Sequence, residues 1–123
     1  MDHKILIIED EDVLGRLLNN KLLEQGYEVV WAKDGQEGYE QIESFAPDLI
    51  LLDIILPKMN GFEVLEKMRL NDNLKRIPVI VISNSGQPVE IERAQKMGVK
   101  DWLVKTEFDP EEVVDKVTRQ LSK

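Results

Sequence analysis

The chain has 123 residues, a formal net charge of −8 and no cysteine. Its length suits one domain, since domains are commonly about 100–150 residues long, and the missing thiols exclude disulfides, thiolate metal sites and cysteine catalysis. The acidic balance, without any run of Lys or Arg, argues against direct nucleic-acid binding, which needs a basic surface.

The chain carries no pattern typical of a membrane protein. No charged segment followed by an apolar run opens it, and the longest apolar stretch, residues 49–56, is interrupted by Asp53. That stretch is far shorter than the roughly 20 residues needed to cross a bilayer. We therefore expect a cytoplasmic protein with no membrane insertion.

Short apolar runs alternate with amphipathic segments along the chain. Several runs are apolar at every position, as strands of a parallel sheet are when both faces are covered. The expected strands are residues 4–8, 27–31, 49–52, 79–82 and 102–104.

Residues at helical spacing follow each expected strand. These residues form five stripes, each expected to lie along one face of a helix. The stripes are Leu14, Leu18 and Leu22; Gly38, Ile42 and Phe45; Phe62, Leu65, Met68 and Arg69; Ile91, Ala94 and Met97; and Val113, Val114, Val117 and Leu121. Gly26, Pro47 and Gly98 follow the first, second and fourth stripes, where glycine or proline commonly ends a helix. Asp109 and Pro110 supply an N-cap and a first residue for the last helix.

This order predicts an α/β, doubly wound (βα)₅ fold of the flavodoxin-like kind. Its five strands would form a parallel sheet in the order 2-1-3-4-5, with helices on both faces. We expect residues 1–123 to form a single domain, with no effector domain in this chain.

Carboxylates follow two of the expected strands. Glu9 and Asp10 come directly after residues 4–8, and Asp53 comes directly after residues 49–52. Taken alone, these acids could cap a turn or begin a helix. In the order 2-1-3-4-5, however, strands 1 and 3 are neighbours where strand order reverses, which is where open α/β sheets bind ligands. Clustered carboxylates repel one another and need a cation, and hard oxygen ligands with open positions favour Mg²⁺.

The ends of the last two strands supply complementary groups. Ser83 follows residues 79–82 and offers a hydroxyl, and Lys105 follows residues 102–104 and offers an ammonium. With the acids, they form a set suited to phosphoryl transfer: a carboxylate nucleophile at Asp53, a divalent cation, and donors for phosphoryl oxygens.

In these segments the sequence resembles the receiver domain of bacterial two-component response regulators, and the resemblance covers essentially the whole chain. The segments that carry it are residues 7–11, 51–57 with Asn60-Gly61, 82–85 and 104–105. The resemblance implies a phosphorelay signalling domain and not an enzyme. Such a domain would catalyse only its own aspartyl phosphorylation and dephosphorylation.

The resemblance also implies a role for each site residue. Asp53 would accept a phosphoryl group from the phosphohistidine of a histidine kinase or phosphotransfer protein, or from a small phosphodonor. Mg²⁺ would bind Glu9, Asp10, Asp53 and the backbone carbonyl of Ile55. Lys105 would pair with the Asp53 carboxylate and later with its phosphate.

The switch implied by the resemblance couples Ser83 to an aromatic residue. Ser83 would move toward the phosphoryl group, and Trp102, three residues before Lys105, would respond. The fourth helix, fifth strand and fifth helix would then form the surface that binds a downstream protein, whose identity no motif specifies.

Several positions depart from the family pattern, and the departure at Thr106 bears most on the placement of Lys105. Thr106 stands where the family usually has a proline, typically preceded by a cis bond. A cis bond before a non-proline residue costs about 2.5–4 kcal/mol. We therefore expect either a trans Lys105–Thr106 bond with a rearranged loop or a strained cis bond held by its surroundings.

Other classes fit the sequence less well. A phosphatase of the haloacid dehalogenase type needs a second acid two residues after its nucleophile, where this chain has Ile55. An FMN carrier needs a phosphate loop rich in Ser, Thr and Gly after the first strand, where residues 9–12 are all acidic. The G-x-G-x-x-G pattern of dinucleotide enzymes is absent. The remaining alternative is a receiver-like interaction module that binds partners without being phosphorylated.

Overall fold

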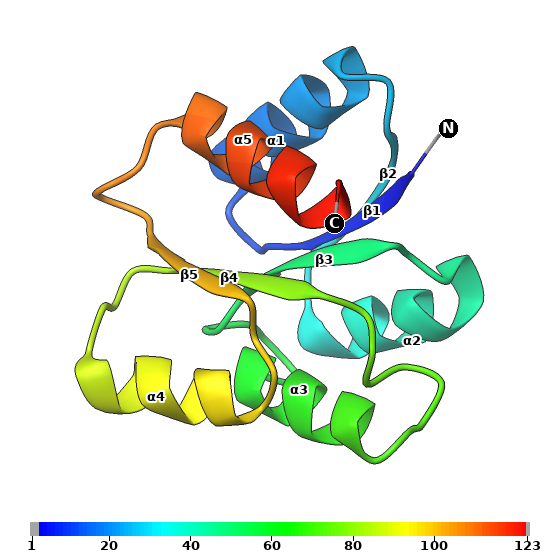
Figure 1. Cartoon of the computed structure of the whole chain (residues 1–123), viewed down its shortest axis with the longest axis vertical. Helices are drawn as coiled ribbons and strands as arrows, with labels where there is room; N and C mark the ends of the chain where they lie inside the picture. Colours follow the sequence, from blue (N-terminus) through cyan, green and yellow to red (C-terminus); the bar gives the residue numbers. More distant parts are fainter. Residues whose placement is uncertain (1–2, 123) are drawn as a thin grey trace.

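The computed structural model describes residues 3–122, in which five strands alternate with five helices (Figure 1). The strands are β1 (Lys4–Ile8), β2 (Glu28–Ala32), β3 (Leu49–Asp53), β4 (Val79–Ser83) and β5 (Asp101–Val104). The helices are α1 (Asp12–Glu24), α2 (Gly35–Phe45), α3 (Gly61–Arg69), α4 (Pro88–Lys96) and α5 (Pro110–Leu121). Each strand lies within one residue of its expected bounds.

The five strands form one parallel sheet in the order β2-β1-β3-β4-β5, which confirms the predicted topology. Helices α1 and α5 cover one face, and α2, α3 and α4 cover the other (Figure 1). Ile8 of β1 pairs with Leu52 of β3. The residues that follow these two strands are therefore brought together at the carboxyl edge of the sheet.

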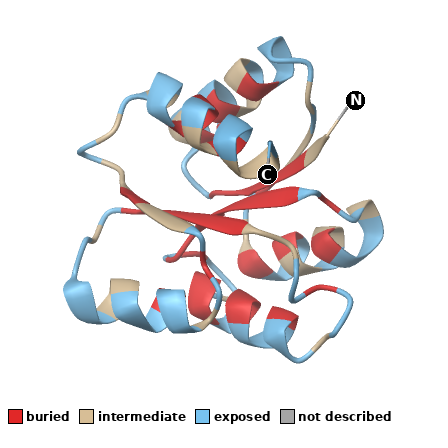
Figure 2. Cartoon of the chain, viewed as in Figure 1, coloured by how far each residue is buried: buried red, intermediate tan, exposed pale blue. Residues whose placement is uncertain are grey.

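Alternation along each strand divides the core into two layers. Ile5 and Ile7 belong to the cluster under α1 and α5, whereas Leu6 and Ile8 belong to the cluster under α2, α3 and α4. All four side chains are fully buried, and Figure 2 shows the central strands as buried along their length. Burying one such side chain contributes about 1.5–3 kcal/mol, so these residues stabilise the sheet that holds the groups at its edge.

Local signals set the helix ends as expected. Gly26 and Gly98 have φ angles of 91° and 90°, in the left-handed region that glycine adopts without strain. The Asp109 side chain accepts a hydrogen bond from the backbone N–H of Glu112 and caps α5.

Within residues 3–122, every helix is too short or too polar to cross a bilayer.

Candidate functional site

The site lies at the carboxyl edge of the sheet, where β1, β3 and β5 end. Glu9 directly follows β1, and its backbone N–H donates to the Ala32 carbonyl oxygen at 3.0 Å, which extends the contact with β2 by one residue. Asp53 is the last residue of β3. Lys105 directly follows β5, and its backbone N–H donates to the Ser83 carbonyl oxygen at 2.7 Å. Backbone pairing thus positions all three side chains.

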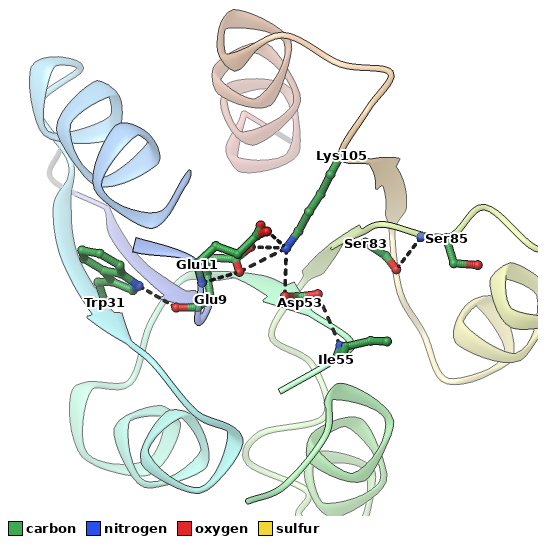
Figure 3. Close-up of polar contacts among 8 residues, drawn as sticks. All are labelled: Glu9, Glu11, Trp31, Asp53, Ile55, Ser83, Ser85 and Lys105. Atoms are coloured by element: carbon green, nitrogen blue, oxygen red, sulfur yellow. Dashed lines mark hydrogen bonds and ion pairs between the residues drawn. The ribbon is translucent and has the colours of Figure 1, made fainter. Parts of the chain in front are cut away.

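The Lys105 ammonium joins the acids of this edge (Figure 3). Its Nζ lies 3.0 Å from Asp53 Oδ2, 3.0 Å from Glu9 Oε1 and 2.7 Å from Glu11 Oε2. The Lys105–Thr106 peptide bond is trans, because no cis bond occurs in the described chain. The lysine therefore reaches Asp53 without a cis bond at this position.

Two carboxylates of this group are buried. Glu9 is 1% exposed and Asp53 is 3% exposed. Burial raises the pKa of Glu9 to about 7, and the charge of Asp53 adds to the effect, whereas hydrogen bonds from the Glu11 N–H and from Lys105 oppose it. Burial alone would lower the pKa of Lys105, but its hydrogen bonds to Glu11, Asp53 and Glu9 outweigh burial and raise that pKa.

The acids of this edge fit a hard divalent cation. Carboxylate oxygens of Glu9, Asp10 and Asp53 lie within 4.8 Å of one another. Glu9 Oε1 is buried and accepts no hydrogen bond, although it lies 3.0 Å from Lys105 Nζ. Asp10 is exposed, so this group of oxygens opens to solvent. Such a set of oxygen donors suits Mg²⁺ or a similar ion.

The raised pKa of Glu9 predicts a pH-dependent metal affinity. Below a pH of about 7 a proton occupies the Glu9 carboxylate and competes with the cation, so Mg²⁺ affinity should rise as the pH increases through about 7. The stability of the metal-free protein should change with pH in the opposite direction. The folded state holds this proton more tightly than the unfolded chain, so stability should fall as the pH rises from 4.5 to about 7.

Calorimetric titration with Mg²⁺ at a series of pH values checks this expectation. A Glu9→Gln variant should bind Mg²⁺ more weakly, with an affinity that changes little across the same range. The same pH slope in both proteins would show that Glu9 is not the competing group.

The remaining predicted residues lie around the acids. The Ser83 side chain is buried, and its hydroxyl accepts a hydrogen bond from the Ser85 N–H at 3.2 Å. Across residues 3–122, no hydrogen bond joins Ser83 to Asp53. Instead, Asp53 Oδ1 accepts from the Ile55 N–H at 3.3 Å. The role of the Ile55 carbonyl as a metal ligand stays a prediction.

Trp102 connects β5 to the loop that follows β4. Its side chain is half-buried, and its indole N–H donates to the Ser85 carbonyl oxygen at 2.8 Å. Ser83 and Trp102, the two residues of the expected switch, are therefore both hydrogen-bonded to the backbone of Ser85.

Two contacts of the site have no counterpart among the expectations. Glu11 makes the shortest contact with Lys105, and Trp31 of β2 donates its indole N–H to the Glu9 carbonyl oxygen at 2.8 Å. In the sequence, nothing distinguishes Glu11 from the other three acids of residues 9–12. The sequence feature that relates to Trp31 is Gly15, a small residue on the buried side of α1 that leaves space for a large side chain.

An open cleft of about 540 Å³ lies beside Lys105. Its lining residues are Glu11, Asp12, Val13, Leu14, Leu17, Asn84 and Lys105. The paired side chains of Glu11 and Lys105 therefore both lie on the wall of this cleft.

Comparisons with known proteins agree with this geometry. Residues 5–118 match the response regulator receiver domain family. The probable transcriptional regulator ycf29 of Porphyra purpurea is 36% identical over 114 residues, which cover 93% of this chain and 54% of that protein. The chemotaxis protein CheY1 of Helicobacter pylori (strain J99) is 34% identical over 116 residues, which cover 93% of each.

A solved structure is similar as well. The crystal structure of the Mn²⁺-bound form of response regulator Rcp1 superimposes with a TM-score of 0.78 at 30% identity, covering 86% of this chain and 83% of that one. The chain spans about half the length of ycf29 but nearly all of CheY1. The family match, the sheet order and the acids at its carboxyl edge lead to one conclusion: this chain belongs to the response regulator receiver domain family, whose members serve phosphorylation-dependent signalling rather than classical enzymatic turnover.

Proposed function

We propose that the chain is a switch in which Asp53 accepts a phosphoryl group with the help of Mg²⁺. The observation that carries the proposal is the Asp53 carboxylate, which is buried at the edge of the sheet, 3.0 Å from the Lys105 ammonium and within the group of oxygens formed with Glu9 and Asp10. A carboxylate so placed is a nucleophile with a cation beside it.

The chemistry requires a carboxylate oxygen of Asp53 to attack the phosphorus of a phosphohistidine. The new O–P bond forms as the P–N bond breaks, and the donor histidine keeps the electron pair of that bond and takes a proton. Mg²⁺ bound by Glu9, Asp10, Asp53 and the Ile55 carbonyl would neutralise charge on the phosphoryl oxygens.

Lys105 lies where it can pair first with the carboxylates and then with the phosphoryl group. In the unmodified protein it pairs with Glu9, Glu11 and Asp53. The phosphoryl group adds about 1.5–2 negative charges and three acceptor oxygens, so Lys105 would turn from the carboxylates toward one of these oxygens. The same site would later release phosphate when water attacks the acyl phosphate.

The signal would leave the site through Ser83. Its hydroxyl now accepts from the Ser85 N–H, and donating to a phosphoryl oxygen would draw Ser83 away from Ser85. Because Trp102 is hydrogen-bonded to the Ser85 carbonyl, the move would reach β5 and change the surface formed by α4, β5 and α5. A shift between two arrangements of this surface would then control binding of a downstream protein.

The partners follow from the chemistry. The donor would be a histidine kinase or a phosphotransfer protein, and the target a protein rather than nucleic acid. Residues 1–123 would act as one receiver unit. Cytoplasmic localisation stays a prediction from the sequence.

Intact-mass measurement after incubation with Mg²⁺ and acetyl phosphate tests the proposal. Wild-type protein should gain the mass of one phosphoryl group, and a chelator should prevent the gain. The alternative, an interaction module that is not phosphorylated, predicts no gain. Protein left unmodified both by acetyl phosphate and by phosphorylated histidine kinases would overturn the proposal.

A further inference from the structure

Strand β2 holds the backbone of Glu9 from both sides. The Glu9 N–H donates to the Ala32 carbonyl oxygen of β2 at 3.0 Å. The Glu9 carbonyl oxygen accepts from the Trp31 indole N–H at 2.8 Å (Figure 3). This carbonyl belongs to the peptide that joins Glu9 to Asp10. The indole therefore sets the plane of the peptide that leads into Asp10.

The position of Asp10 depends on this peptide. Its side chain is exposed, and across residues 3–122 no hydrogen bond or ion pair holds it. The Glu9 carboxylate, by contrast, is tied to the Glu11 N–H at 3.0 Å and to Lys105. A rotation of the Glu9–Asp10 peptide would therefore displace the Asp10 carboxylate first.

Helix α1 leaves room for the Trp31 ring at Gly15. A Cβ atom at residue 15 would lie 2.7 Å from Trp31 Nε1, and closer still to Cζ2 and Cε2. Glycine is unfavourable inside a helix relative to alanine. Its presence on this buried side of α1 is explained by the indole that packs against it.

Lys33 links the ring to the start of α1. Its Nζ lies 4.9 Å from the centroid of the Trp31 ring and 2.9 Å from Asp12 Oδ1. The hydrogen bond from Lys33 also lowers the pKa of Asp12, which keeps that carboxylate charged for the pair. Trp31 thus contacts the acidic segment directly at Glu9, and through Lys33 at Asp12.

We propose that Trp31 is a positioning residue for metal binding. Its indole N–H orients the Glu9–Asp10 peptide so that both carboxylates reach the same cation as Asp53. The inference rests on the proposed function in one respect, namely that Mg²⁺ is the ion. Trp31 itself touches neither the ion nor the phosphoryl group.

A Trp31→Phe variant tests the inference, because it keeps an aromatic ring against Gly15 but removes the donor. Calorimetric titration with Mg²⁺, without a phosphodonor, should give an affinity about three- to tenfold weaker than that of wild type, as expected for one lost hydrogen bond. An affinity within about twofold of wild type would overturn the proposal.

Val29→Ala is the matched control. Val29 lies on the same face of β2 and packs in the same cluster as Trp31, but it donates nothing to Glu9. This variant should lower the free energy of unfolding and leave Mg²⁺ affinity unchanged. An equal loss of affinity in both variants would mean that Trp31 acts only through packing, against the proposal.

Gly15→Ala should break the same hydrogen bond in a second way, because the added Cβ would displace the indole. It should weaken Mg²⁺ binding in wild type but add little in the Trp31→Phe background, where the donor is already absent. Additive losses would contradict a shared mechanism.

The measurements separate this inference from the proposed function. Wild-type protein that binds Mg²⁺ but is never phosphorylated would count against the proposed function alone. Equal affinities in wild type and Trp31→Phe would count against Trp31 alone, and a wild type that binds no Mg²⁺ would contradict both.

Discussion

Replacing Asp53 by asparagine should abolish phosphorylation while the protein stays folded. Asparagine has nearly the shape of aspartate, and its oxygen can still accept the hydrogen bond that the Ile55 N–H now donates to Asp53 Oδ1. Its amide is a poor nucleophile and carries no charge for the cation. Intact mass after incubation with Mg²⁺ and acetyl phosphate should therefore show no added phosphoryl group.

The stability of this variant distinguishes lost chemistry from lost structure. Three carboxylates now surround one ammonium, at Glu9, Glu11 and Asp53, so removing one negative charge relieves repulsion. The free energy of unfolding without metal should stay within about 1 kcal/mol of wild type or exceed it. Asp72→Asn, at a side chain that is 91% exposed, should be phosphorylated like wild type. A gain in mass by the Asp53 variant equal to that of wild type would place the phosphoryl group on another residue.

The fold was predictable because burial leaves a simple pattern in this sequence. All five side chains of β3 and of β4 are buried, so these strands are apolar up to the final Asp53 and Ser83. Glycine and capping residues then locate the helix ends independently. The two kinds of signal agree along the chain, so the expected strands match the observed strands to within one residue.

The grouping of the site residues was predictable for a related reason. Parallel strands end at one edge of a sheet, so residues that directly follow them must lie near one another. Strand order alone is therefore sufficient to bring Glu9, Asp53 and Lys105 together, but it does not determine which donor contacts which acceptor.

The individual contacts of the site could not be predicted. The bond from Trp31 to Glu9 depends on the register between β1 and β2 and on the space left by Gly15 of α1, and neither follows from periodicity within one element. Glu11 could have turned to solvent like its neighbours, but its side chain pairs with Lys105. Ser83 likewise bonds to Ser85 rather than to Asp53, because side-chain rotation selects among nearby partners.

Lys105→Met should produce the largest loss of stability among substitutions in the site. Methionine keeps much of the length of lysine but removes the cation, so Glu9 and Asp53 would remain buried without a partner. Removing one member of a buried ion pair costs about 3–5 kcal/mol. Because Lys105 lowers the pKa of Glu9, this pKa should rise further in the variant. The loss should therefore be small below a pH of about 7, where a proton already neutralises Glu9 in wild type, and should grow as the pH rises above it.

Mg²⁺ should reverse much of this loss, since the missing ammonium and the metal neutralise the same carboxylates. Urea unfolding of the Lys105→Met variant with and without Mg²⁺ measures the effect, and calorimetry should show tighter Mg²⁺ binding than in wild type because no ammonium competes. Lys116→Met removes a partly exposed pair with Asp101, at 2.8 Å, and should cost less than about 1 kcal/mol with no response to Mg²⁺. If both variants lost equal stability and neither recovered it with Mg²⁺, Lys105 would not be the counterion of a metal site. Recovery in the Lys105 variant alone would mean that the buried carboxylates of Glu9 and Asp53 need a neighbouring positive charge. Lys105 would supply that charge in the metal-free protein, and Mg²⁺ would supply it in the metal-bound protein.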